Sequence, residues 1–281
     1  MSATVLRSRL EVACTRTRLL QAGPAEASEA VVFVHGNPGS AEDWERLVTA
    51  AAGAGLRALA FDLPDFGETV APAGFEHDVP GYATFLGEAL AALGVQRAHL
   101  VLHDFGGPIG LVWTAMNPEA LASVTLIDTG ILPGYKWHRL ARIWRTTIVG
   151  ELFQATATRS AFRFLLNRNE PRGLPREFVD QMYDHYDRRT RKAVLALYRA
   201  TDDPGSAAAG YSELMAPRDV PALVIWGEHD AYLPSSFATR QREAFPSADV
   251  HVLPASGHWP YADDPETVER LLVEFLSGLT T

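Results

Sequence analysis

The sequence has only one cysteine, Cys14, among its 281 residues. A disulfide within the chain is therefore impossible, and this scarcity favours a reducing compartment. Because Cys14 precedes the expected core strands, we expect it to be a small buried residue and not a reactive thiol. Residues 1–20 lack the continuous apolar region of a signal peptide, and no apolar run reaches the roughly 18 residues of a membrane span. We therefore expect a cytoplasmic protein without a membrane partner.

An excess of positive charge is also missing. The chain has 25 basic and 34 acidic residues and a formal net charge of −9, which argues against a nucleic-acid partner and favours solubility. Hydrophobic residues make up 47% of the chain, which suits a buried core. At this length the chain forms one large α/β domain or two small ones.

What the sequence does contain is an alternation of strand and helix patterns. Residues 4–20 alternate loosely and predict an antiparallel hairpin at a sheet edge. The patterns that follow predict strands near 31–34, 57–61, 98–102 and 123–127, with helices near 42–54 and 82–93. Strands that alternate with helices indicate a parallel sheet. Sites in such sheets lie beyond the carboxyl ends of the strands.

Residues 131–215 interrupt this alternation. They show no convincing strand, and their loop-like stretch is Asp202–Ser206. Their apolar spacing predicts helices over 137–152, 161–166, 175–186 and 189–200.

Asp104 is the most informative residue, because it stands where a serine would be expected. An apolar strand pattern over 98–102 precedes it, and small residues and an apolar helix pattern over 109–116 follow it. A strand, a sharp turn and a helix form a nucleophile elbow, which exposes its central side chain beside helix N–H groups. A carboxylate there can attack an electrophilic carbon without being deprotonated first, and it forms an ester that water must cleave. The pattern predicts a hydrolase with a covalent carboxylate ester.

The sequence His-Asp-Phe-Gly-Gly at 103–107 resembles the elbow of the epoxide hydrolase and haloalkane dehalogenase branch of the α/β-hydrolase superfamily. Further segments are similar to the strands and loops of this branch: 31–39 with the oxyanion loop, 60–69, 222–230 with the triad acid, and 256–260 with the triad histidine.

This resemblance implies an α/β-hydrolase fold with a mostly parallel eight-stranded sheet flanked by helices. It also implies a core domain of residues 1–130 and 216–281, with residues 131–215 inserted as a helical cap.

The resemblance assigns roles to a set of late-loop residues. His258 is expected to activate the water that cleaves the Asp104 ester, and Asp230 to hold the tautomer of its imidazole. Asp128 ends the preceding predicted strand, where some dehalogenases place the acid. It remains an alternative acid, a helper, or a turn residue. His35 and His103 are expected to satisfy buried backbone groups, and no residue spacing predicts a metal or another cofactor.

The residues that would stabilise charge decide the substrate class. The backbone N–H groups of Asn37 and Phe105 are expected to bind the oxyanion. Dehalogenases of this branch hold the halide with Asn at the position of Asn37 and Trp at the position of Phe105. A phenyl ring has no N–H, and losing such a donor costs roughly 2–3 kcal/mol, unless Trp137 or Trp144 replaces it.

An epoxide instead needs a proton for its departing oxygen. Tyr198, which precedes an arginine, resembles the second cap tyrosine of epoxide hydrolases, whereas the first has no clean match. Asn37, Leu102 and residues 150–155 look more like dehalogenases, and Phe105 and Tyr198 more like epoxide hydrolases. Because a donor for a leaving halide is missing at Phe105, the sequence narrowly favours an epoxide hydrolase, with a haloalkane dehalogenase as the alternative.

Two other classes stay open: an esterase or lactonase, and a non-catalytic member that binds a ligand. We expect a monomer or homodimer that takes a small hydrophobic organic substrate and water. The expected apolar pocket residues are Trp137, Trp144, Phe153, Phe162 and Phe164.

Overall fold

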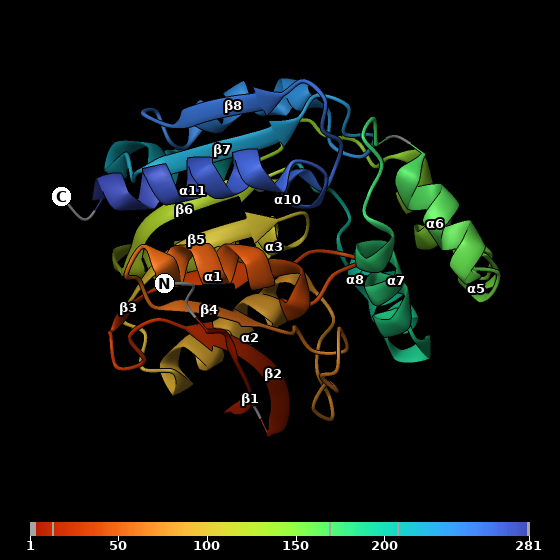
Figure 1. Cartoon of the computed structure of the whole chain (residues 1–281). Helices are drawn as coiled ribbons and strands as arrows, with labels where there is room; N and C mark the ends of the chain where they lie inside the picture. The colour runs from red at the N-terminus through yellow and green to blue at the C-terminus, as the bar shows by residue number, and fades with distance from the viewer. Residues whose placement is uncertain (1–3, 13, 169, 207, 280–281) are drawn as a thin grey trace.

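Eight strands form a single sheet in the computed structural model, which describes residues 4–12, 14–168, 170–206 and 208–279 (Figure 1). The order across the sheet is β1-β2-β4-β3-β5-β6-β7-β8. The strands are β1 (Leu6–Val12), β2 (Thr15–Ala22), β3 (Glu29–Val34), β4 (Ala58–Phe61), β5 (Arg97–His103), β6 (Leu121–Ile127), β7 (Ala222–Gly227) and β8 (Asp249–Leu253). Only β2 pairs antiparallel, with β1 and with β4, and every other pairing is parallel. The predicted mostly parallel eight-stranded sheet and its N-terminal hairpin are confirmed.

The parallel register brings the loops of the site together. Val34 is paired with Leu102 in β5, and Ile127 in β6 is paired with Ile225 in β7. The strands β3, β5, β6 and β7 are buried almost throughout, as the continuous apolar runs of a sheet covered on both faces require. Because their carboxyl ends lie at one edge, the loops that follow them meet there.

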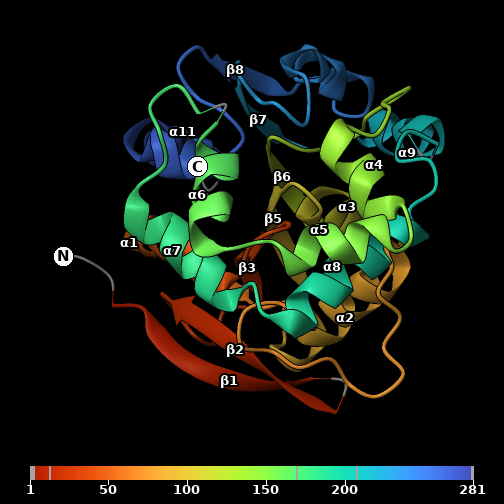
Figure 2. The same cartoon turned by 90° about the vertical axis from the view of Figure 1, so that its right-hand side faces the viewer.

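Helices cover both faces of the sheet. Helices α1 and α11 lie on one face, and α2 and α3 lie on the other (Figures 1 and 2). Their bounds are α1 (Glu45–Gly53), α2 (Val79–Ala92), α3 (Gly106–Met116), α10 (Pro260–Asp263) and α11 (Pro265–Leu279), with 3₁₀ turns η1 (Ala41–Trp44), η2 (Pro118–Ala120), η3 (Ala216–Arg218), η4 (Ser235–Phe237) and η5 (Thr239–Glu243). The side chain of Asp78 caps α2 by accepting from Gly81 N–H at 2.7 Å.

The chain between β6 and β7 forms helices and no strand among its described residues. All but the last of these helices, which packs against the core, lie beyond the carboxyl ends of the strands (Figure 1). They are α4 (Arg139–Arg145), α5 (Val149–Ala155), α6 (Arg159–Asn167), α7 (Arg176–His185), α8 (Arg188–Ala200) and α9 (Ala208–Met215). We call residues 131–215 the helical segment.

One sequence prediction for the helical segment was wrong, and one of its helices was not predicted. A single helix over 137–152 is two helices, because the β-branched run 146–149 disfavours a helix and Ile148 has φ of 71°. The sequence did not predict α9, which packs on the core: the Tyr211 ring lies 6.2 Å from that of Phe245.

The expectation for Cys14 was also wrong. Cys14 is exposed at the turn between β1 and β2, with φ of 61°, because the end of this edge hairpin faces solvent. None of the described helices is both long enough and apolar enough to cross a bilayer.

Candidate active site

Asp104 occupies a tight turn between β5 and α3. Its φ of 48° lies in the left-handed region, which Asp adopts more readily than most residues. A Cβ on Gly36 would lie 2.4 Å from the Cβ of Asp104, and one on Gly106 would lie 2.2 Å from the carbonyl oxygen of Val34. The Thr129 hydroxyl donates to the Asp104 carbonyl at 2.5 Å. These close approaches hold the Asp104 side chain above the sheet edge.

Two donors act on the Asp104 carboxylate. The backbone N–H of Asn37 donates to Oδ1 at 2.7 Å, and Nε2 of His258 lies 3.5 Å from Oδ2. Burial raises the pKa of Asp104, but the contacts with His258 outweigh it, so the pKa lies below its usual value. Asp104 is therefore ionised near neutral pH, as a carboxylate nucleophile must be.

His258 is oriented by Asp230. Its Nδ1 lies 2.8 Å from Oδ2 of Asp230. The other oxygen, Oδ1, accepts from the backbone N–H groups of Tyr232 at 2.7 Å and Leu233 at 3.0 Å. The Asp230 carboxyl thus accepts all three bonds, and it places the Nδ1 proton of the imidazole on the side away from Asp104.

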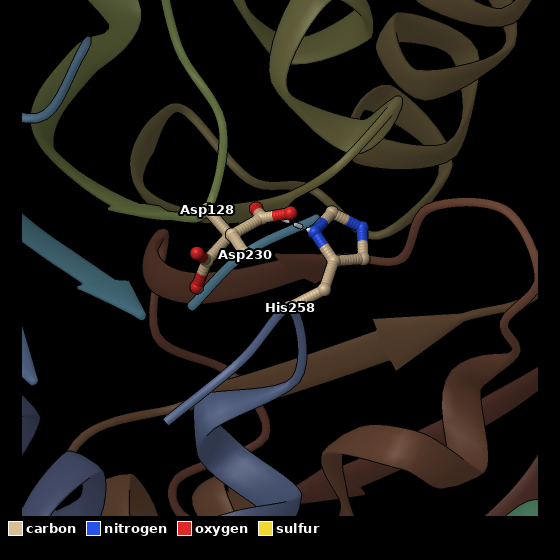
Figure 3. A group of neighbouring side chains, drawn as sticks. All are labelled: Asp128, Asp230 and His258. Atoms are coloured by element: carbon tan, nitrogen blue, oxygen red, sulfur yellow. Dashed lines mark hydrogen bonds and ion pairs between the residues drawn. The ribbon is translucent and has the colours of Figure 1, made fainter. Parts of the chain in front are cut away.

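The structure places Asp128 beside this pair without an ion-pair contact to His258. Figure 3 shows the two carboxyls side by side next to the imidazole. Oδ1 of Asp128 accepts from Gly227 N–H at 2.9 Å, and Oδ2 has no hydrogen-bond partner among the described residues. Burial and the neighbouring Asp230 raise the pKa of Asp128 well above its usual value. The geometry favours Asp230 as the acid, with Asp128 a neutral neighbour.

Asp128, Asp230 and His258 are also close enough to be considered as metal ligands, since their ligand atoms lie within 4.8 Å of one another. Both oxygens of Asp230 and one of Asp128 already accept hydrogen bonds, and no fourth ligand from the described residues joins the three. That the site holds no metal therefore remains a prediction made from the sequence.

The resting site combines an anion with a cation. Burial lowers the pKa of His258, but Asp230 and Asp104 outweigh it and raise the pKa well above the usual value. If Asp104 became an ester, its charge would vanish and one of the two contributions to this raised pKa would be lost. His258 would then release its proton more easily, and it would act as a base when an ester is present.

A largely apolar cavity of about 210 Å³ opens beside Asp104 and His258. Its wall includes Asn37 and, from the helical segment, Trp144, Phe153 and Tyr198, together with Phe162 and Phe164. All of these were predicted for the site. Trp137 and Phe105 line a different cavity of about 250 Å³, which also touches Asp104 and Tyr198. The Trp137 indole donates to the Thr201 carbonyl at 3.3 Å.

The sequence profile of the alpha/beta hydrolase fold family matches residues 29–265. The chain belongs to this family. A 2-hydroxy-6-oxononadienedioate/2-hydroxy-6-oxononatrienedioate hydrolase of Burkholderia vietnamiensis is 28% identical over 268 residues, which cover 89% of this chain and 87% of that protein. The protein is accordingly a hydrolase of the α/β-hydrolase superfamily.

Solved structures of two hydrolase classes share the fold. The haloalkane dehalogenase DbeA of Bradyrhizobium elkani has a TM-score of 0.84 at 22% identity, with 99% of each chain covered. The epoxide hydrolase VrEH1 of Vigna radiata has a TM-score of 0.80 at 18% identity, with 98% of each chain covered. At these identities the similarity establishes the fold.

Sequence reasoning missed three residues at the site of this α/β-hydrolase. His138 and Tyr186 line the cavity beside Asp104, and Glu170 accepts from the backbone N–H of His258 at 2.9 Å. Tyr186 also accepts from the Gln154 amide at 2.8 Å. No motif marks these residues, because the path of the helical segment alone brings them to the sheet edge.

Proposed function

We propose that this hydrolase opens small hydrophobic epoxides through a covalent ester on Asp104, which water activated by His258 then cleaves. The observation that carries this proposal is the ionised carboxylate at the elbow, 3.5 Å from the imidazole of a His258–Asp230 pair. In this proposal the helical segment acts as a cap, because it contributes most of the apolar wall of the cavity beside Asp104.

Tyr198 supplies the proton in the first step. Its side chain lines the cavity, and its ring lies 4.9 Å from that of Phe105. Burial and the charge of Asp104 raise the pKa of Tyr198 well above its usual value, although the nearby amide of Asn37 lowers it. The hydroxyl therefore stays protonated. Asp104 attacks the epoxide carbon, the carbon–oxygen bond breaks, and the alkoxide takes the Tyr198 proton.

The second step begins when the imidazolium of His258 gives up its proton. With Asp104 esterified, the proton of His258 returns to the tyrosinate and leaves a neutral imidazole. This imidazole takes a proton from water, and the hydroxide attacks the ester carbonyl. The N–H groups of Asn37 and Phe105 stabilise the oxyanion. Collapse releases the diol and restores the Asp104 carboxylate and the imidazolium.

A second function, carbon–halogen hydrolysis, is favoured by two unpaired donors. Asn37 and Trp144 both line the cavity, and the Asn37 side-chain amide and the Trp144 indole nitrogen are buried without a hydrogen-bond partner among the described residues. Buried N–H groups without partners are uncommon, and a leaving halide would satisfy them. Trp144 would thus replace the donor that Phe105 lacks.

The cavity does not suit the dicarboxylate named for the Burkholderia relative. Two carboxylates require cationic partners when they are buried. The described residues that line this cavity include no Lys or Arg, and the imidazolium of His258 already pairs with Asp104 and Asp230. An uncharged, apolar substrate matches the wall better.

Replacing Tyr198 by phenylalanine should slow the opening of styrene oxide roughly 10²-fold, because the alkoxide loses its proton donor. Replacing Trp144 by phenylalanine should leave this step within about threefold of wild type. Stopped-flow or quenched single-turnover measurements of ester formation give both rates.

The control variant is Tyr183→Phe, which removes a phenol of the helical segment outside the cavity, where it donates to the Ala157 carbonyl at 3.1 Å. A dehalogenase gives the opposite pattern with 1-bromobutane: Trp144→Phe slows it roughly 10- to 10²-fold, and Tyr198→Phe does not. That pattern without epoxide opening would replace the lead proposal by the second.

A further inference from the structure

Glu170 links the helical segment to the loop that carries His258. It lies in the connection between α6 and α7. Its Oε1 accepts from the backbone N–H of His258 at 2.9 Å. The preceding N–H, of Gly257, donates to Oδ2 of Asp263 in α10 at 2.9 Å. Two carboxyls, one from the helical segment and one from the core, thus bind consecutive backbone groups of the same loop.

The loop fits closely around Glu170. A Cβ on Gly257 would lie 2.1 Å from Oε2 of Glu170, so a larger residue there would displace the carboxyl. Arg172 forms a second tie between the same connection and the core, with Nη1 2.7 Å from Oδ2 of Asp264. Glu170 is buried. Burying a carboxyl costs free energy unless hydrogen bonds compensate for the lost water.

We propose that Glu170 is a positioning residue for His258: by binding the His258 backbone, it makes the placement of the imidazole depend on docking of the α6–α7 connection. This inference rests on the proposed role of His258 as the base. Unlike the residues that line the cavity, Glu170 acts through His258 and not on the substrate.

The same contact makes docking depend on pH. Burial raises the pKa of Glu170 to about 8, and Asp263 adds to this effect, whereas the backbone and charge of His258 oppose it. Among the described residues, the phenols of Tyr232 and Tyr261 also interact electrostatically with Glu170. Docking therefore takes up a proton. Its free energy weakens as the pH rises from the usual 4.5 of a free carboxyl towards about 8, and then levels off.

Hydrogen exchange measured by mass spectrometry on the peptide that covers residues 253–262 tests this inference. Glu170→Ala should speed exchange of this peptide about tenfold at neutral pH, because it removes the acceptor of the His258 amide. Glu170→Gln should restore wild-type protection, since a carboxamide oxygen accepts the same bond. It should also remove the loss of protection that we expect of the wild type as the pH rises from 4.5 towards about 8. The matched control is Glu177→Gln, the same charge change at an exposed site in α7.

Kinetics supply the second readout. In single-turnover experiments with styrene oxide and with 1-bromobutane, Glu170→Ala should slow ester hydrolysis about tenfold and leave ester formation unchanged. Unchanged exchange in Glu170→Ala, a Glu170→Gln variant that keeps the wild-type pH dependence, or equal slowing of both steps would overturn the inference. If neither compound formed an ester, the proposed function would fail, while the exchange data would still decide whether Glu170 positions the loop.

Discussion

Asp104→Asn should reduce turnover by roughly 10⁴-fold or more, the scale expected when one member of a catalytic triad is removed. The amide keeps the size of the side chain but has no anionic oxygen to attack carbon. Asn tolerates the left-handed backbone that Asp104 adopts with φ of 48°, so the elbow should still form. The measurement is kcat/KM with styrene oxide and 1-bromobutane, with thermal unfolding recorded in parallel.

The matched control for this variant is Asp249→Asn, which changes an exposed carboxylate at the start of β8 that lines neither cavity. It should retain turnover within about threefold of wild type. An Asp104→Asn protein that is folded and retains a tenth of wild-type activity would show that the elbow carboxylate is not the nucleophile.

His258→Gln should separate the two chemical steps. Glutamine cannot take a proton from water, so ester hydrolysis should slow roughly 10²- to 10⁴-fold. Ester formation should continue, because Asp104 needs no base, and the glutamine amide can still donate to its carboxylate. Intact-mass analysis should then show the protein heavier by one molecule of styrene oxide, or by one butyl group after 1-bromobutane has lost its bromide, and peptide mapping should place the adduct on Asp104.

The same adduct must be missing from the double variant Asp104→Asn/His258→Gln, which keeps the rest of the cavity. An adduct that persists in the double variant would locate the alkylation elsewhere. A His258→Gln protein that turns over as fast as wild type would remove His258 from the mechanism.

The fold could be predicted from the sequence because its local signals agree with one another. The apolar strand before Asp104 and the small residues after it define the elbow without any tertiary information. The order of Asp104, Asp230 and His258 along the chain then fits a parallel sheet whose loops meet at one edge. The 2.8 Å contact between His258 and Asp230 favours Asp230 over Asp128 as the partner of the imidazole, a choice that the sequence left open.

The helical segment could be predicted only in part. Its amphipathic helices α6, α7 and α8 follow the apolar spacing, but that spacing did not reveal the break at Ile148, where the β-branched run 146–149 disfavours a helix. A Cβ on Gly150 would lie 2.6 Å from the carbonyl oxygen of Trp144. Such contacts between neighbouring helices leave no periodic signal in the sequence.

For the same reason Glu170 and Tyr186 could not be found beforehand. Glu170 follows the end of α6 and Tyr186 follows the end of α7. Neither residue lies near a recognisable motif in the sequence. Trp137 and Trp144 are equally plausible from sequence, yet only Trp144 lines the cavity beside His258. The substrate preference depends on which of these side chains faces Asp104.

The source of the oxygen in the product tests the covalent route most directly. With enzyme in excess over styrene oxide in ¹⁸O-labelled water, one turnover should release diol without ¹⁸O, because its new oxygen comes from Asp104. The label should instead appear in the Asp104 carboxylate, and in the diol only from later turnovers. Labelled diol in the first turnover, with an unlabelled Asp104, would mean that water attacks the substrate directly and would contradict the ester mechanism.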